Sequence, residues 1–188
     1  MRLRLHSDLP IPVKRLIWEV KYGLLNYGFS AAPKSLIDLL CKSLPRESAL
    51  LDLGCGSASL LPALRATGWA GQYCGVDIST SAISKNKKMG DAKSSWIVSD
   101  IESFETPLSW DAVVMLESAY YVKLENLAAV LRRLSSQVKK GGFFVFRFHD
   151  TVKYQEYISQ IRIVFPTGRV QGEKMLFCPV TNDRAGLG

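Results

Sequence analysis

Cysteine and histidine are both scarce in this sequence, and neither is grouped. The chain of 188 residues contains four cysteines and two histidines. No two cysteines are separated by only two residues, which argues against a structural zinc site and against a disulfide framework. We therefore expect reduced, mostly buried thiols and no bound metal. The four cysteines are Cys41, Cys55, Cys74 and Cys178.

Long hydrophobic runs are also missing. No apolar stretch approaches the roughly 20 residues that a membrane-spanning helix needs. Two arginines stand close to the N-terminus, but the apolar core of a secretory signal does not follow them. The sequence therefore predicts a cytoplasmic protein with no membrane span.

The positive charge of the chain is not concentrated in one place. The net charge is +7 and the pI is about 9.3, yet the lysines and arginines are scattered along the chain. No long basic tract or RNA-binding module is present, so the composition favours a solvated surface over a nucleic-acid partner. An RNA substrate stays open as an alternative because of the charge itself.

The most informative stretch runs from Leu50 to Leu60. An apolar run ends in Asp52, then Gly54 and Gly56 follow one residue apart, and then a helix-compatible segment begins. This pattern predicts a buried parallel strand, a tight turn and a helix N-terminus. Glycines let the backbone approach a ligand closely, and the helix offers unpaired N–H groups to a polar or anionic ligand end.

Two further strand-then-acid units follow this turn. One strand ends at Asp77 and the next ends at Asp100. Asp77 lies about 20 residues past Gly56, the interval at which such folds place an acid on ribose hydroxyls. A dinucleotide-binding turn needs a third glycine where Ser59 stands, which argues against a nicotinamide-dependent dehydrogenase.

These motifs together resemble the class I S-adenosylmethionine-dependent methyltransferases, whose signature is a hydrophobic strand followed by D-x-G-x-G-x-G. This chain has LLDLGCGSA at 50–58, with Ala58 where the third glycine usually stands. The resemblance covers about residues 34–149. It implies S-adenosyl-L-methionine as cofactor and, from the residues after the fourth strand, a small-molecule acceptor methylated on O or N, such as a sugar, an amino-sugar, a lipid or another metabolite.

The resemblance also implies roles for individual residues. Asp77 is expected on the ribose hydroxyls, Asp100 on the adenine amino group, and Asp52 on the methionine ammonium. Glu117, just after the fourth strand, is expected near the methionine and the reacting centre. For each carboxylate the structural alternative is a helix cap or a surface ion pair. The remaining cofactor contacts are expected from the backbone of Gly54, Cys55 and Gly56 and from Ile78 and Ile101 beside the adenine ring.

Candidate catalytic residues follow from the same strand ends. His149 ends the fifth strand and is the first candidate for a general base, because imidazole exchanges protons readily near neutral pH. Glu117 and Tyr121 are the further candidates. Tyr120 and Tyr121 are expected either to wall the substrate or to pack in the core. The structural alternative for His149 is a histidine that only supports the fold.

The expected fold is an α/β, doubly wound, mostly parallel Rossmann-like sheet with helices on both faces, either seven-stranded or abbreviated at its C-terminal end. Alternation of strands and helices requires right-handed crossovers and places the ligand crevice at the C-terminal strand ends. Strands are expected at 72–76, 95–98, 110–116, 142–148 and 174–180, with a first strand that ends at Asp52. Helices are expected at 13–25, 33–40, 60–68, 82–89, 124–138 and 153–161.

We expect a single methyltransferase domain over residues 1–188. Residues 1–33 form an N-terminal lid or cap in the resembled family; the alternative is that Trp18, Tyr22, Tyr27 and Phe29 only pad the sheet edge. Residues 34–149 form the cofactor-binding core, and residues 150–188 complete the sheet. A shortened C-terminal end and a single candidate base motivate a non-catalytic cofactor-binding protein as the alternative function.

Overall fold

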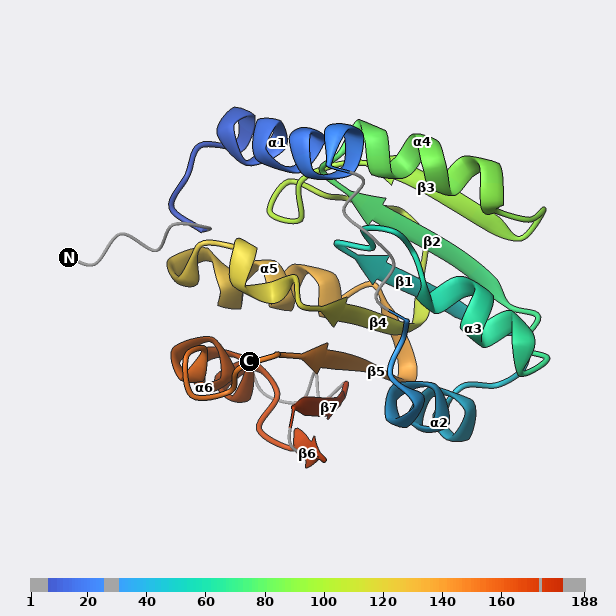
Figure 1. Ribbon diagram of the computed structural model, residues 1–188. Helices are drawn as coiled ribbons and strands as arrows, with labels where there is room; N and C mark the ends of the chain where they lie inside the picture. The colour runs from blue at the N-terminus through green and yellow to red at the C-terminus, as the bar shows by residue number, and fades with distance from the viewer. Residues whose placement is uncertain (1–6, 26–30, 173, 181–188) are drawn as a thin grey trace.

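The computed structural model describes residues 7–25, 31–172 and 174–180 of the chain. Seven strands in these ranges form one sheet in the order β3-β2-β1-β4-β5-β7-β6 (Figure 1). The strands β1 to β5 pair with one another in parallel, while β7 runs antiparallel to both β5 and β6. The strands are β1 Ala49–Leu53, β2 Gln72–Asp77, β3 Ser94–Val98, β4 Trp110–Leu116, β5 Val138–Arg147, β6 Arg169–Gln171 and β7 Met175–Pro179.

Helices connect the parallel strands and cover both faces of the sheet (Figure 1). Among the described residues, no helix combines the length and hydrophobicity that a bilayer crossing requires. The helices are α1 Ile11–Glu19, the π-helical turn η1 Val20–Leu24, α2 Lys34–Ser43, α3 Leu60–Ala66, α4 Thr80–Met89, the 3-10 turn η2 Ala119–Tyr121, α5 Leu124–Ser135 and α6 Gln155–Val164.

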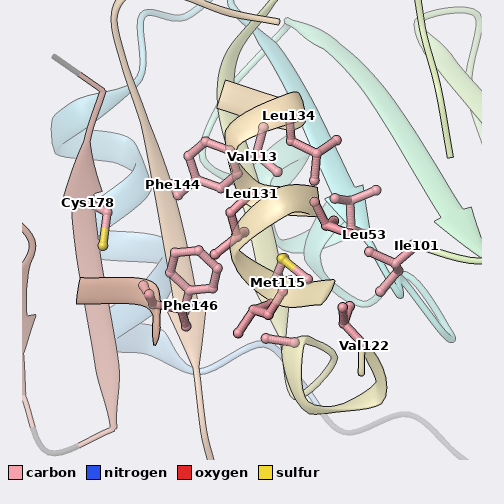
Figure 2. Packing of buried hydrophobic residues seen from close by; sticks show 14 of the residues in the cluster. Leu53, Ile101, Val113, Met115, Val122, Leu131, Leu134, Phe144, Phe146 and Cys178 are labelled. Carbon is pink, nitrogen blue, oxygen red and sulfur yellow. The ribbon is translucent and has the colours of Figure 1, made fainter. Parts of the chain in front are cut away.

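Two hydrophobic cores lie on opposite faces of the sheet because successive strand residues point to opposite sides. In β4, Val113 and Met115 belong to the core that α5 and α6 cover, while Ala112 and Val114 belong to the core that α2 and α3 cover. Figure 2 shows the first core, where Leu131 of α5 lies against the side chains of the central strands. This double burial explains why β4 is apolar at almost every position.

The C-terminal end of the sheet is complete, so the abbreviated alternative is wrong. Both β6 and β7 form, although β6 has only three residues. β7 pairs with β5 from Phe143 opposite Pro179 to Arg147 opposite Met175. A short antiparallel hairpin is enough to finish the sheet, because it needs no crossover helix between its strands.

The predicted boundary between α5 and β5 is wrong. The helix ends at Ser135 and not at Val138, and β5 begins at Val138 and not at Gly142. Val138 pairs with Trp110 of β4, and a bulge follows before the regular pairing resumes at Ala112. Gly142 fits this bulge, since a Cβ there would lie 2.7 Å from the carbonyl oxygen of Asp111. Gly141 and Gly142 therefore lie within a strand and do not end the helix.

A side-chain cap begins α4. Ser79 precedes the helix, and its hydroxyl accepts a hydrogen bond of 3.1 Å from the backbone N–H of Ala82. This bond satisfies one of the N–H groups that lack a partner in the first helical turn. The cap fixes the direction in which the chain leaves β2, immediately after Asp77.

Candidate active site

A cavity of about 600 Å³ opens at the C-terminal ends of the parallel strands. Residues that are far apart in the sequence meet there because parallel strands end at the same edge of the sheet. All of the residues predicted for cofactor binding or catalysis line this cavity: Asp52, Gly54, Cys55, Gly56, Asp77, Ile78, Asp100, Ile101, Glu117, Tyr121 and His149. The structure thus gathers them at one place, and their individual roles remain predictions.

The glycine turn after β1 has the left-handed backbone that its sequence predicts. Gly54 has φ +76° and Gly56 has φ +49°, a region that L-residues with a Cβ adopt only at a cost. Gly54 also faces Ser118, since a Cβ at position 54 would lie 2.4 Å from the Ser118 Cβ. Ser118 itself is fixed, because its hydroxyl donates a hydrogen bond of 2.5 Å to the Leu53 carbonyl oxygen.

We expect Gly54→Ala to destabilise the protein more than Gly68→Ala. Both glycines have positive φ, but a Cβ at Gly68 meets no atom within 4 Å. Gly68→Ala should therefore lower the free energy of unfolding only by the cost of a positive φ for alanine, about 1–2 kcal/mol. Gly54→Ala should lower it further, because the added Cβ also clashes with Ser118. Urea unfolding of both variants measures the difference, and equal losses would contradict the steric argument.

Asp77 at the end of β2 stabilises the glycine turn through a hydrogen bond. Its Oδ2 accepts a hydrogen bond of 2.8 Å from the Gly56 N–H, and its Oδ1 accepts one of 2.9 Å from the Ser79 N–H. Burial raises the pKa of Asp77, and these two N–H donors oppose that shift. Each carboxylate oxygen keeps a second lone pair, so Asp77 can still accept hydrogen bonds from a ligand in the cavity.

Asp52 near the end of β1 is almost fully buried, and only one of its two carboxylate oxygens has a hydrogen-bond partner among the described residues. The Tyr73 hydroxyl donates a hydrogen bond of 2.6 Å to its Oδ2. Its Oδ1 is buried and has no hydrogen-bond partner among the described residues. Burial raises the pKa of Asp52 to about 7, with a smaller contribution in the same direction from Asp77, while the Tyr73 hydrogen bond opposes the shift. A cationic group is the ligand that would stabilise this carboxylate.

The other side of the cavity carries Asp100, Ile78 and Ile101. Asp100 lies just past β3 and accepts a hydrogen bond of 2.8 Å from the Glu102 N–H through Oδ1. Cys55 lies in the glycine turn, where burial raises the pKa of its thiol well above the usual value. A thiol of this kind stays protonated, so Cys55 has no character of a nucleophile.

Glu117 is the centre of a polar cluster beyond β4. Its Oε1 accepts a hydrogen bond of 2.5 Å from Arg147 Nη1, and its Oε2 lies 2.7 Å from His149 Nδ1. The backbone N–H of His149 donates to the same Oε2 at 2.8 Å. Glu117 has φ +57°, a conformation that costs a non-glycine residue about 1–3 kcal/mol and is typical of functional sites. Arg147, the last residue of β5, and His149, two residues beyond the strand, thus hold this strained residue in place.

Aromatic rings surround this cluster. Tyr120 stacks on Tyr154 with ring centroids 4.1 Å apart, and the edge of His149 meets both rings. The Tyr120 hydroxyl lies 3.3 Å from Glu117 Oε2. Tyr120 is buried, while Tyr121 is half-buried, so both of the expected arrangements occur: Tyr120 packs in the core, and both rings line the cavity.

Residues 11–24, which form α1 and η1 and are here named the cover segment, close one side of the cavity. Trp18 and Tyr22 stack at 5.5 Å and both line it, which favours the cover over the alternative of padding at the sheet edge; the role of a lid stays a prediction. Tyr27 and Phe29 lie outside the described residues. The buried Lys14 holds the segment down, since its Nζ donates a hydrogen bond of 2.8 Å to the Tyr121 carbonyl oxygen.

Several residues of the cavity wall were not predicted. Arg147 is the last residue of β5, so its position at a strand end near His149 was the available signal. Tyr154 precedes α6, and Lys14 gave no such signal, because its partner lies on another element. Tyr73, which holds Asp52 from β2 and does not line the cavity, was missed because that contact depends on strand register.

Comparisons with known proteins agree with this architecture. Residues 26–175 match the family described as a methyltransferase domain. Magnesium protoporphyrin IX methyltransferase from Synechocystis PCC 6803, solved with S-adenosylmethionine, is 14% identical with a TM-score of 0.67, and the match covers 93% of this chain and 99% of that one. An N-methyltransferase from Bradyrhizobium japonicum WM9 is 17% identical with a TM-score of 0.59, over 78% of this chain and 90% of that one.

A curated relative also matches in sequence. Carboxy-S-adenosyl-L-methionine synthase from Campylobacter curvus is 27% identical over 121 residues, which are 63% of this chain. The match spans about half, 51%, of that relative's length. Because the family match extends over most of the chain and the seven-stranded sheet agrees with it, this chain belongs to the methyltransferase domain family and has the fold of the class I S-adenosylmethionine-dependent methyltransferases.

Proposed function

We propose that the protein transfers the methyl group of S-adenosylmethionine to an oxygen or nitrogen atom of a small molecule. The observation that carries this proposal is the cavity itself, in which the acids of β1 and β2 and the cluster around Glu117 and His149 share one space. Trp18 and Tyr22 of the cover segment line one side of this space. A cavity of about 600 Å³ is in the range of small-molecule sites.

The residues of the cavity fit the cofactor. The buried Asp52 Oδ1 without a partner suits the methionine ammonium. Gly54 and Gly56 line the cavity without side chains, so they would contact the methionine tail through their backbone. Asp77 would accept from the ribose hydroxyls. Asp100 would accept from the adenine amino group, with Ile78 and Ile101 on either side of the ring.

The bound sulfonium supplies an already activated methyl group, so the protein mainly has to orient the acceptor and exclude water. For a hydroxyl acceptor, His149 is the proposed base. Glu117 Oε2 accepts from Nδ1–H in the arrangement that leaves Nε2 free to take a proton. The Glu117 carboxylate then stabilises the imidazolium, and Arg147 keeps that carboxylate oriented.

Cofactor binding should depend on pH through Asp52. Its pKa of about 7 means that the carboxyl is largely protonated at pH 6. The ionised form is the one that pairs with an ammonium, so binding must release a proton below pH 7. We expect the affinity for S-adenosylmethionine to rise by up to about tenfold per pH unit from pH 5.5 to 7.

Calorimetry in buffers of different ionisation enthalpy measures this proton release. Asp52→Asn should bind more weakly at pH 7 and lose the pH dependence, while Asp38→Asn, an exposed acid on α2, should behave as the wild type. An affinity that falls between pH 5.5 and 7 would contradict the assignment of Asp52.

The function itself is tested by transfer of a labelled methyl group. Purified protein is incubated with labelled S-adenosylmethionine and pools of sugars, amines, phenols, lipids and RNA, after calorimetry with the cofactor, with S-adenosylhomocysteine and with NAD. Binding of the first two and label in a small-molecule pool would support the proposal. Cofactor binding without transfer to any pool would favour a non-catalytic protein, and label in RNA alone would favour the RNA alternative.

A further inference from the structure

The cover segment presents an apolar face to the outside of the molecule. Leu16 is 64% exposed and Leu24 is 81% exposed, and Leu25, just beyond the segment, is 69% exposed. Figure 1 shows α1 at the rim of the molecule beside α4. Five exposed apolar residues share one face of the segment at helical spacing: Val13, Leu16, Ile17, Val20 and Leu24.

The opposite face of the segment is polar or aromatic and is turned inward. Lys14 is buried and bound to the Tyr121 carbonyl oxygen. The Glu19 carboxylate accepts hydrogen bonds from the backbone N–H groups of Thr80 and Ser81 at the start of α4. An ordinary surface helix turns its apolar side to the core, so this orientation is reversed. These inward contacts oppose any rotation that would bury the apolar face.

The charges beside the apolar face are positive. The cover segment and α4 together carry six basic side chains and one acid. The acid, Glu19, is hydrogen-bonded at the start of α4, and Lys14 is buried. The other five basic side chains therefore give the surface of the cover segment and α4 its positive charge. The six basic side chains are Lys14, Arg15, Lys21, Lys85, Lys87 and Lys88.

We propose that the cover segment docks the protein on the surface of an anionic lipid bilayer. An amphipathic helix that carries leucines on one face, with lysine and arginine around it, lies in the plane of the membrane interface with its apolar face among the acyl chains. Basic residues near it are attracted to anionic headgroups. The segment of 14 residues (11–24) is too short to cross a bilayer, so it would lie on the surface.

A second copy of the chain is the competing occupant of this face. A two-fold contact would bring the same patch of both copies together, and their positive edges would then repel each other. An anionic bilayer offers the opposite charge at the same place. Charge complementarity therefore favours an anionic bilayer over a second copy of the chain.

Docking would bring the cover segment to the lipid headgroups. Trp18 and Tyr22 line the cavity from the opposite face of the same segment, so the cavity would lie next to the bilayer.

Vesicle flotation of the full chain tests the proposal without measuring methyl transfer. We expect the protein to float with vesicles of phosphatidylcholine and phosphatidylglycerol, and much less with phosphatidylcholine alone or at high salt. The double variant Leu16→Gln/Leu24→Gln should lose binding by about tenfold or more, because two leucines no longer enter the bilayer. The matched control is Leu108→Gln/Ile163→Gln, which changes two exposed apolar residues before β4 and on α6 and should float as the wild type.

Thermal unfolding and S-adenosylhomocysteine binding of both double variants show whether each is folded. Failure of the wild type to float with anionic vesicles would overturn the proposal. Equal flotation of the cover variant and the control would overturn it too. Light scattering without vesicles completes the test, since a dimer that Leu16→Gln/Leu24→Gln dissociates would assign the face to a second copy instead.

Discussion

A His149→Asn variant is expected to lose about two to four orders of magnitude in turnover, while it binds S-adenosylmethionine as tightly as the wild type. The loss follows from the position of the imidazole, whose Nδ1 is held 2.7 Å from Glu117 Oε2 so that Nε2 can accept the proton of the substrate. The measurement is single-turnover transfer of a labelled methyl group to the acceptor found in the screen, with calorimetry of the cofactor alongside.

Two further variants test whether the loss of turnover comes from the Glu117–His149 pair and not from a general change in the loop. Glu117→Gln removes the charge that stabilises the imidazolium, so turnover should fall while cofactor affinity changes less. Thr151→Ala alters the same loop two residues after His149, at a half-buried residue that is not part of the cavity lining, and should leave turnover unchanged. Unaltered turnover in a folded His149→Asn protein would show that His149 supports the structure only, or that the acceptor is an amine that needs no base.

An Asp77→Asn variant is expected to bind S-adenosylmethionine about 5- to 150-fold more weakly, which corresponds to about 1–3 kcal/mol. The carboxylate is proposed to accept hydrogen bonds from the ribose hydroxyls, and the amide replaces one acceptor with a donor. The same change sets an NH₂ group against the N–H of Gly56 or Ser79, both of which donate to Asp77. We therefore also expect a lower free energy of unfolding.

A double-mutant cycle separates these two effects. The second change is made in the ligand, with an S-adenosylhomocysteine analogue that lacks one ribose hydroxyl. Wild type should lose affinity for the analogue, whereas Asp77→Asn should lose little more. Additive losses in the cycle would contradict the ribose assignment even if the single variant binds weakly. Asp38→Asn again serves as the control.

The arrangement of the site along the chain was predictable because it depends on local patterns. A strand that ends in an acid and is followed by glycines or a cap can be recognised within about ten residues. Asp52, Asp77 and Asp100 were found in this way, and the parallel sheet brings their strand ends together. The pairing of Val138 with Trp110 was missed, since it depends on strand β4 across the bulge and not on the helix pattern that precedes it.

The sequence by itself determined the fold class, the glycine turn and the acids at the strand ends, because each depends on backbone conformation within a few neighbouring residues. Only the tertiary structure decided which side chains meet across those elements. Tyr73 reaches Asp52, and Arg147 reaches Glu117, through strand register. The outward apolar face of the cover segment was likewise decided by distant contacts. Amphipathic spacing defines two faces of a helix, whereas the contacts of Lys14, Trp18 and Glu19 with other elements fix which one turns inward.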